Sequence, residues 1–335
     1  MLRRLINFLA GRAVRPPSPT DANSLVGEGD RLARGGALLA ALARYRQALA
    51  ADARCLNAHL GMGNVMVDLW MLEDAVAAYG RALALAPKSA ALRSALLFHR
   101  HYLEPVDAQA LFAAHAEAGA MLSAAAGPDD PLPVRSTQGR KIRIGYVSPN
   151  FSRHSVGYFI EPVIRNHDRS RFEIFCYYAH ARADDATARF RAMSDGWHDV
   201  PDADGSELAA MVRADRIDVL VDLAGHSKAN KLEAFALKPA PVQVTWLGYP
   251  DTTGLPAMDI RLTDAIADPA PQAEALNSEK LVRIEGSFLC YQPPVDSPPP
   301  GAHIHPPSAI VFGSFNNIAK ISAGTVRACP VRGWC

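Results

Sequence analysis

The chain has 335 residues, enough for two compact units, and its 35 Lys and Arg residues nearly balance its 34 Asp and Glu residues. A net charge of +1 provides neither a basic field for nucleic acid nor an acidic tail, so no nucleic-acid partner is expected. The apolar runs fall short of the roughly 20 residues that a membrane helix requires, so no membrane partner is expected either.

The first 20 residues are predicted to be a loose leader. They begin with a basic end and a short apolar stretch, as a signal peptide does, but Arg12 and Arg15 follow closely and favour a frayed or amphipathic leader. The five cysteines show no regular spacing and no CxxC pair, which is typical of buried thiols in a reducing compartment. We therefore expect a cytoplasmic protein.

Residues 21–125 are predicted to be a helical repeat segment. Tyr45 and Tyr79 lie 34 residues apart, and their flanking sequences repeat with the same offset. This period, with small residues where paired helices touch, is typical of tetratricopeptide repeats, which bind other proteins. Two repeats of two helices are expected over residues 21–87. The helical spacing that continues over residues 88–125 predicts helices that cap the open end of the solenoid.

A Gly- and Pro-rich linker is predicted at residues 126–140, and the sequence period then changes to that of strands. Residues 141–292 are expected to form an α/β lobe with a doubly wound parallel sheet, because apolar strands alternate with helical segments. Ligands of such sheets bind beyond the carboxyl ends of the strands. The predicted strands are residues 142–147, 172–178, 217–223, 242–247, 259–262 and 280–284, with a helix at 208–212.

The last part of the chain is expected to be short of a full domain. Residues 293–309 are rich in proline and predict an extended linker. Residues 310–321 begin with a fresh apolar strand and would open a second α/β lobe. Residues 322–335 show neither helical nor strand period and are interpreted as an aberrant tail. The second lobe is therefore predicted to be missing from this chain.

Three loops at predicted strand ends carry polar groups. His154 in the first loop could accept a proton near neutral pH, or could simply cap a helix or lie on the surface. His226 in the second loop follows Gly225, in a turn that could hold an anion or merely connect a strand to a helix. Thr252 and Thr253 in the third loop could line a sugar or phosphate site, or only shape the turn.

Two further features bear on charge and metals. Lys320 stands just past the strand of the expected second lobe and would suit a diphosphate as a point charge, although a solvated lysine is the alternative. The histidine pairs at residues 99 and 101 and at residues 303 and 305 lack the spacing or the further ligands that a metal needs, so no metal site is expected.

Taken together, these motifs resemble the bacterial protein O-linked N-acetylglucosamine transferases, and the resemblance runs from about residue 21 to Lys320. Tetratricopeptide repeats directly before the catalytic domain are that family's layout. The resemblance implies a Rossmann-like amino-terminal lobe of a GT-B glycosyltransferase. It implies inverting transfer of N-acetylglucosamine from UDP-GlcNAc to Ser or Thr hydroxyls of proteins, with no metal and no cofactor. The segments that carry it are residues 143–151 with His154, 222–227, 239–250 and 278–281.

The resemblance also implies roles for individual residues. His154 matches the family's histidine proposed as a base, and Lys320 matches the lysine that neutralises the departing UDP diphosphate. The residues expected to bind the donor are Asn317, His226, Thr252 and Thr253.

The chain departs from the family at two positions of this region, with Asp251 in place of the usual glycine and Lys231 where the family often has arginine. Two alternatives stay open at this stage. One is a non-catalytic tetratricopeptide scaffold that binds proteins. The other is a related glycosyltransferase that uses another nucleotide sugar.

Overall fold

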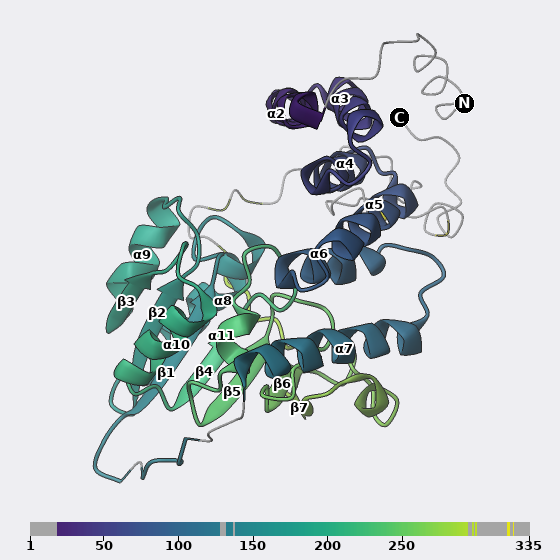
Figure 1. Ribbon diagram of the computed structural model, residues 1–335. Coiled ribbons are helices and arrows are strands. Elements are labelled where there is room, and N and C mark those ends of the chain that lie inside the picture. Colours follow the sequence, from purple (N-terminus) through teal and green to yellow (C-terminus); the bar gives the residue numbers. More distant parts are fainter. Residues whose placement is uncertain are drawn as a thin grey trace. The chain divides into compact units, whose positions relative to one another are not determined.

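The computed structural model of the chain describes residues 19–127, 132–136 and 138–293, with the single residues 297, 299, 320, 321 and 324. The chain divides into two compact units and passes from the first to the second between Val106 and Asp107. The first unit is helical and the second is built on a parallel sheet (Figure 1). Among these described residues, no helix has both the length and the apolar character needed to cross a membrane.

Five described helices make up the first unit, and consecutive helices pack on one another. The expected helices of residues 21–87 are confirmed, and helical structure continues beyond them. The helices are α2 (Pro19–Arg34), α3 (Leu38–Ala51), α4 (Leu56–Asp68), α5 (Leu72–Leu85) and α6 (Ala90–Arg100).

The 34-residue offset of the sequence reappears as equivalent contacts. Tyr45 and Tyr79 are both buried, and each hydroxyl donates a hydrogen bond of 2.7 Å to a side chain 15 residues earlier. A Cβ added to Gly29 would come within 2.6 Å of the Tyr45 ring, and one added to Gly63 within 2.8 Å of the Tyr79 ring. The small residues of the repeat are therefore the places where the tyrosine rings need room.

The second unit contains a seven-stranded sheet in the order β3-β2-β1-β4-β5-β6-β7, with every neighbouring pair parallel. Its strands are β1 (Ile142–Ser148), β2 (Phe172–Tyr178), β3 (Gly196–Asp199), β4 (Val219–Asp222), β5 (Val242–Trp246), β6 (Ile260–Thr263) and β7 (Lys280–Arg283). Its helices are α7 (Ala108–Ala126), α8 (Ser155–Arg165), α9 (Asp185–Met193), α10 (Gly205–Ala214), α11 (Leu232–Ala236) and the 3₁₀ turn η1 (Ala273–Leu276).

The expected doubly wound sheet is confirmed, because helices cover both of its faces (Figure 1). One apolar cluster joins the sheet to α8 and α9, through Ile160, Ile164 and Phe190. The other joins the opposite face to α10 and α11, through Leu208, Val212, Phe235 and their neighbours. Burial on both faces explains why the central strands are nearly continuous apolar runs.

The placement of α7 differs from the sequence expectation. Residues 88–125 were expected to cap the helical repeats, but α7 belongs to the second unit and packs against α11 and η1. A Cβ on Gly119 of α7 would lie only 1.8 Å from the Gly254 carbonyl oxygen, in the loop after β5. This approach of helix to loop requires glycine at position 119 and fixes α7 to the sheet unit.

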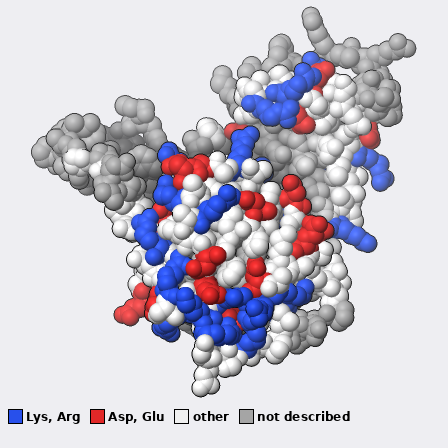
Figure 2. All heavy atoms as spheres, turned by 90° about the vertical axis from the view of Figure 1, so that its left-hand side faces the viewer, with Lys and Arg blue, Asp and Glu red and all other residues white. Residues whose placement is uncertain are grey.

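The amino ends of the central strands carry paired charges. Arg135 and Arg140 both contact Asp218, at 2.7 Å and 2.6 Å, and Arg143 pairs with Glu173 at 2.8 Å. Figure 2 shows basic side chains gathered in the lower part of one face of the molecule, with acidic side chains among them. These ion pairs lie at the opposite edge of the sheet from the loops that follow β1, β4 and β5.

Candidate functional site

The topology singles out the carboxyl edge of the sheet between β1 and β4. The chain moves from β1 to β2 on one side and returns to place β4 on the other side of β1. This reversal is the switch point at which α/β sheets bind ligands, because the loops diverge there and leave a crevice. Val147 pairs with Asp222, and Asp222 with Thr245, so the loops after β1, β4 and β5 emerge side by side.

His154 closes the loop after β1. It is the N-cap of α8, and its Nδ1 accepts the backbone N–H of Val156 at 3.2 Å. The residue is exposed, although partial desolvation lowers the pKa of its imidazole. The helix N-terminus also disfavours a cation at this position. His154 is therefore neutral at neutral pH, and because Nδ1 is the acceptor, Nε2 carries the proton.

Asp222 shapes the turn after β4. Its carboxylate accepts the backbone N–H groups of Ala224 at 3.0 Å and Gly225 at 2.8 Å, and the Thr245 hydroxyl at 2.8 Å. The side chain is fully buried, and this burial raises the pKa of its carboxyl group to about 6 in spite of those three hydrogen bonds. The turn therefore contains a buried carboxyl group at the switch point, and burial disfavours its charged form.

The loop after β5, residues 248–254, is held by Glu279, which directly precedes β7. Glu279 is buried and accepts the Thr252 hydroxyl at 2.5 Å, the Thr253 backbone N–H at 2.7 Å, and the Thr253 hydroxyl. Arg261 donates to the Pro250 carbonyl from the other side, at 2.8 Å. One side chain from β6 and one from the residue before β7 therefore fix the backbone of this loop.

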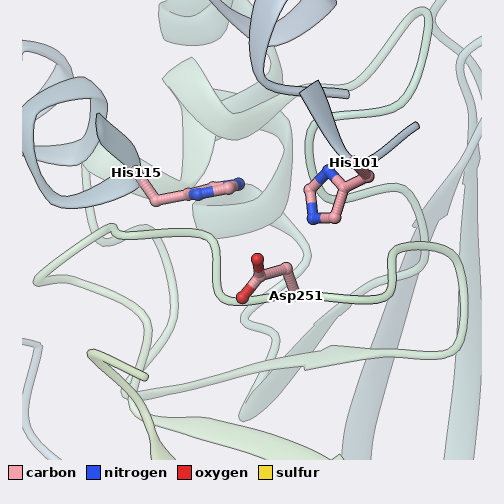
Figure 3. A group of neighbouring side chains, drawn as sticks. All are labelled: His101, His115 and Asp251. Atoms are coloured by element: carbon pink, nitrogen blue, oxygen red, sulfur yellow. The ribbon is translucent and has the colours of Figure 1, made fainter. Parts of the chain in front are cut away.

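Three buried rings join the loops to α7. The Tyr249 hydroxyl lies 2.8 Å from Nε2 of His115, and His226 packs edge-on against both rings, with centroid separations of 5.2 Å and 5.5 Å. Nε2 of His226 donates to the Thr253 carbonyl at 2.8 Å. Figure 3 shows His115 extending from α7 over the loop that carries Asp251. The loops after β4 and β5 and the helix α7 thus meet in one cluster.

Comparisons with known proteins agree with this geometry. Residues 131–292, which include every strand of the sheet, match the sequence profile described as glycosyl transferase family 41. We refer to this matched range as the family 41 segment. A solved structure of a Thermobaculum terrenum O-GlcNAc transferase mutant is similar, with a TM-score of 0.73 and 33% identity, covering 85% of this chain and 61% of that chain.

Curated relatives match the same region. A SPINDLY protein of Arabidopsis thaliana, described as a probable UDP-N-acetylglucosamine–peptide N-acetylglucosaminyltransferase, is 48% identical over 191 residues, 55% of this chain and 20% of that protein. A SPINDLY protein of Oryza sativa subsp. japonica is 40% identical over 259 residues, 74% of this chain and 27% of that protein. The chain therefore spans about a quarter or less of the length of these relatives.

The predicted site residues of the family 41 segment differ in how well their positions in the structure fit the predicted contacts. His154 and His226 lie on loops that flank the switch point, as the motifs predicted. Thr252 and Thr253 were expected to contact the donor. In the structure both side chains are fully buried, and their hydroxyl groups are hydrogen-bonded to Glu279. His226 is also buried, with Nε2 on the Thr253 carbonyl. These three residues shape the site, and a donor contact for them stays a prediction.

The second-lobe residues are placed less completely. Asn317 lies outside the described residues, as do most positions of the predicted proline-rich linker and tail. Lys320 is described as a single exposed position, so its expected role at the diphosphate stays a prediction.

Sequence reasoning missed two residues of the family 41 segment and its surroundings. Glu279 lies in a segment that carried the family resemblance, but nothing local showed that its carboxylate holds a loop 26 residues away. His115 carried no signal at all, because its partner Tyr249 is 134 residues away in the chain.

Proposed function

We propose that this chain is a protein O-GlcNAc transferase that moves N-acetylglucosamine from UDP-GlcNAc to Ser or Thr hydroxyls of proteins. The observation that carries the proposal is the family 41 match over a sheet whose switch point holds His154 and the Asp222 turn. The names of the relatives, and the similarity to a solved O-GlcNAc transferase structure, support the donor and the peptide acceptor.

The reaction exchanges one bond for another at the anomeric carbon. The acceptor oxygen forms a bond to C1 of the sugar as the bond from C1 to the diphosphate breaks, with inversion, and the hydroxyl proton leaves the acceptor. Negative charge grows on the diphosphate, so a fixed cation near it lowers the barrier. Lys320 is proposed for this role, and Lys320→Ala is expected to reduce kcat on the order of 10²-fold, with a smaller change in KM for the donor.

The geometry of His154 favours hydrogen-bond donation over proton abstraction. Its Nδ1 already accepts the Val156 N–H, so neutral His154 carries its proton on Nε2. A ring in this tautomer orients an oxygen of the donor or acceptor. To act as a base through Nε2 it would first have to give up the proton there and break its contact with the helix.

The helical unit is proposed to bind the acceptor protein, because repeats of 34 residues with two helices each commonly do so. The buried thiols of Cys55 and Cys176 fit a reducing compartment, and we propose the cytoplasm.

The test measures transfer of labelled sugar from UDP-GlcNAc to an acceptor protein by the purified chain and by three variants. His154→Gln keeps an N–H donor without a basic nitrogen, so it is expected to retain more activity than His154→Ala. His180→Ala, which alters an exposed histidine at the end of the neighbouring strand β2, is the control and should retain full activity.

Three results would contradict parts of this proposal. Equal loss in His154→Gln and His154→Ala would show that the basic nitrogen of His154 is needed. Transfer from another nucleotide sugar alone would overturn the donor assignment, and absence of transfer from any nucleotide sugar would overturn the enzymatic proposal.

A further inference from the structure

The helix α7, which contacts the loop after β5, lies outside the sequence range that matches family 41. That match begins at residue 131, whereas α7 ends at Ala126. His115 of α7 is completely buried, and so are its neighbours His226 and Tyr249 to within a few per cent. A helix that precedes the matched range thus supplies a polar group to the interior of the site.

The hydrogen bonds of His115 fix its tautomer. Nδ1 lies 2.8 Å from the Leu111 carbonyl oxygen, which can only accept, so Nδ1 carries a proton. In the neutral ring Nε2 is therefore an acceptor, and it receives the Tyr249 hydroxyl at 2.8 Å. Loss of either partner would leave a buried polar atom without this bond, which is costly in an apolar setting.

Tyr249 also fixes the turn after β4. Gly225 has a left-handed backbone with φ of 51°, and a Cβ at this position would lie 2.3 Å from the Cβ of Tyr249. The tyrosine ring packs against His226 of the same turn. At the other end of the loop, the Gly254 backbone packs against the backbone of α7. A Cβ added to Gly254 would lie 2.0 Å from the His115 carbonyl oxygen. The position of Tyr249 thus determines the backbone positions of both the loop after β4 and the loop after β5.

From this geometry we infer that His115 is a positioning residue, which holds the loops after β4 and β5 in register at the switch point through its hydrogen bond to Tyr249. It touches no reacting atom. The inference rests on the proposed function only for its effect on turnover, since the placement of the loops can be measured without any substrate.

The chain offers a matched control. Tyr146 on β1 is buried and its hydroxyl lies 2.8 Å from Nε2 of His167, the same pair of groups at the same distance. His167 precedes β2, so this second pair lies toward the amino edge of the sheet, away from the loops in question. Tyr146→Phe and Tyr249→Phe each remove one tyrosine–histidine hydrogen bond from the same unit, part-buried in the first case and buried in the second, without changing side-chain volume appreciably.

The experiment measures amide hydrogen exchange in residues 224–227 and 248–254 of the full chain, and kcat and KM for UDP-GlcNAc. Tyr249→Phe is expected to raise exchange in both loops by about ten-fold or more and to lower kcat on the order of ten-fold, with KM changed less. Tyr146→Phe should alter neither. His115→Gln, whose amide oxygen can accept the Tyr249 proton, should restore most of what His115→Ala loses.

Equal exchange of the two loops in Tyr249→Phe and Tyr146→Phe would overturn the inference, because the hydrogen bond would then contribute only general stability. Failure of His115→Gln to improve on His115→Ala would overturn it as well. If the unaltered chain transfers no sugar, the proposed function fails, but the exchange comparison still decides the role of His115.

Discussion

Asp222 makes the stability of the sheet unit depend on pH in an unusual direction. Burial raises the pKa of its carboxyl group in the folded protein to about 6, from a reference value of 3.8. A group with a raised folded pKa binds its proton more tightly in the folded state. Its stabilising contribution is therefore present at low pH and is lost as the pH rises through about 6. At pH 7 Asp222 is ionised, and the folded state is less stable than it would be with Asp222 protonated.

The size of the effect follows from the two pKa values. A gap of about two pH units corresponds to about 3 kcal/mol over the full range, of which about 1 kcal/mol develops between pH 7 and pH 5. Burial lowers the pKa of His154 and His167, and these groups act in the opposite direction over the same range. The contribution of Asp222 is therefore isolated by comparison with Asp222→Asn, in which the histidines are unchanged.

The assay is urea unfolding at pH 5 and pH 7, followed by the fluorescence of Trp197 and Trp246 after Trp70 and Trp334 are replaced by phenylalanine. On lowering the pH, the free energy of unfolding of the Asp222 protein should gain about 1 kcal/mol relative to Asp222→Asn. Asp264→Asn is the control. Backbone N–H groups lower the Asp264 pKa, so that carboxylate stays ionised over this range. A relative gain of zero, or a loss, would refute the claim that Asp222 is buried with a raised pKa.

Three glycine substitutions test the backbone conformation and the packing. Gly36→Ala and Gly80→Ala both place a Cβ in open space, but Gly36 has φ of +77° and Gly80 lies inside α5. We expect Gly36→Ala to destabilise and Gly80→Ala to stabilise the helical unit, each by about 1 kcal/mol, and equal signs in thermal unfolding would contradict this reasoning. Gly119→Ala should destabilise the sheet unit by about 1–3 kcal/mol or more, since its Cβ would meet backbone atoms of Gly254; an unchanged melting temperature would show that α7 does not pack there.

The sequence predicted elements best where a local pattern and burial agree. β2 was predicted with the bounds that the structure shows, because the largely apolar run there is preceded by Arg171 and followed by Ala179 and His180. β3 was missed, since it is a four-residue edge strand with one neighbour and a mixed polar sequence. The helix α7 was predicted as a helix but assigned to the wrong neighbour, because a 3.6-residue period does not say which surface the apolar face meets.

At the candidate site, the sequence predicted the types of residue but not the directions of their side chains. As hydroxyl side chains in a loop at a strand end, Thr252 and Thr253 could line a ligand site or only shape the turn, and the family resemblance led us to expect donor contacts. The structure turns both hydroxyls inward to Glu279, which lies 27 and 26 residues further along the chain. The sequence shows which groups are present at a strand end, whereas the direction in which they point depends on a distant partner.

The compact unit that contains the family 41 segment is larger than the matched sequence. The family 41 match begins at residue 131, but the compact sheet unit begins at Asp107. Without α7, Tyr249 would lose the acceptor for its hydroxyl, and the Gly254 backbone would lose the helix that covers it. Both losses fall on the loops that flank the switch point, where small displacements matter most for a reaction that depends on alignment. A fragment cut at the matched boundary should therefore have a complete sheet but poorly fixed loops.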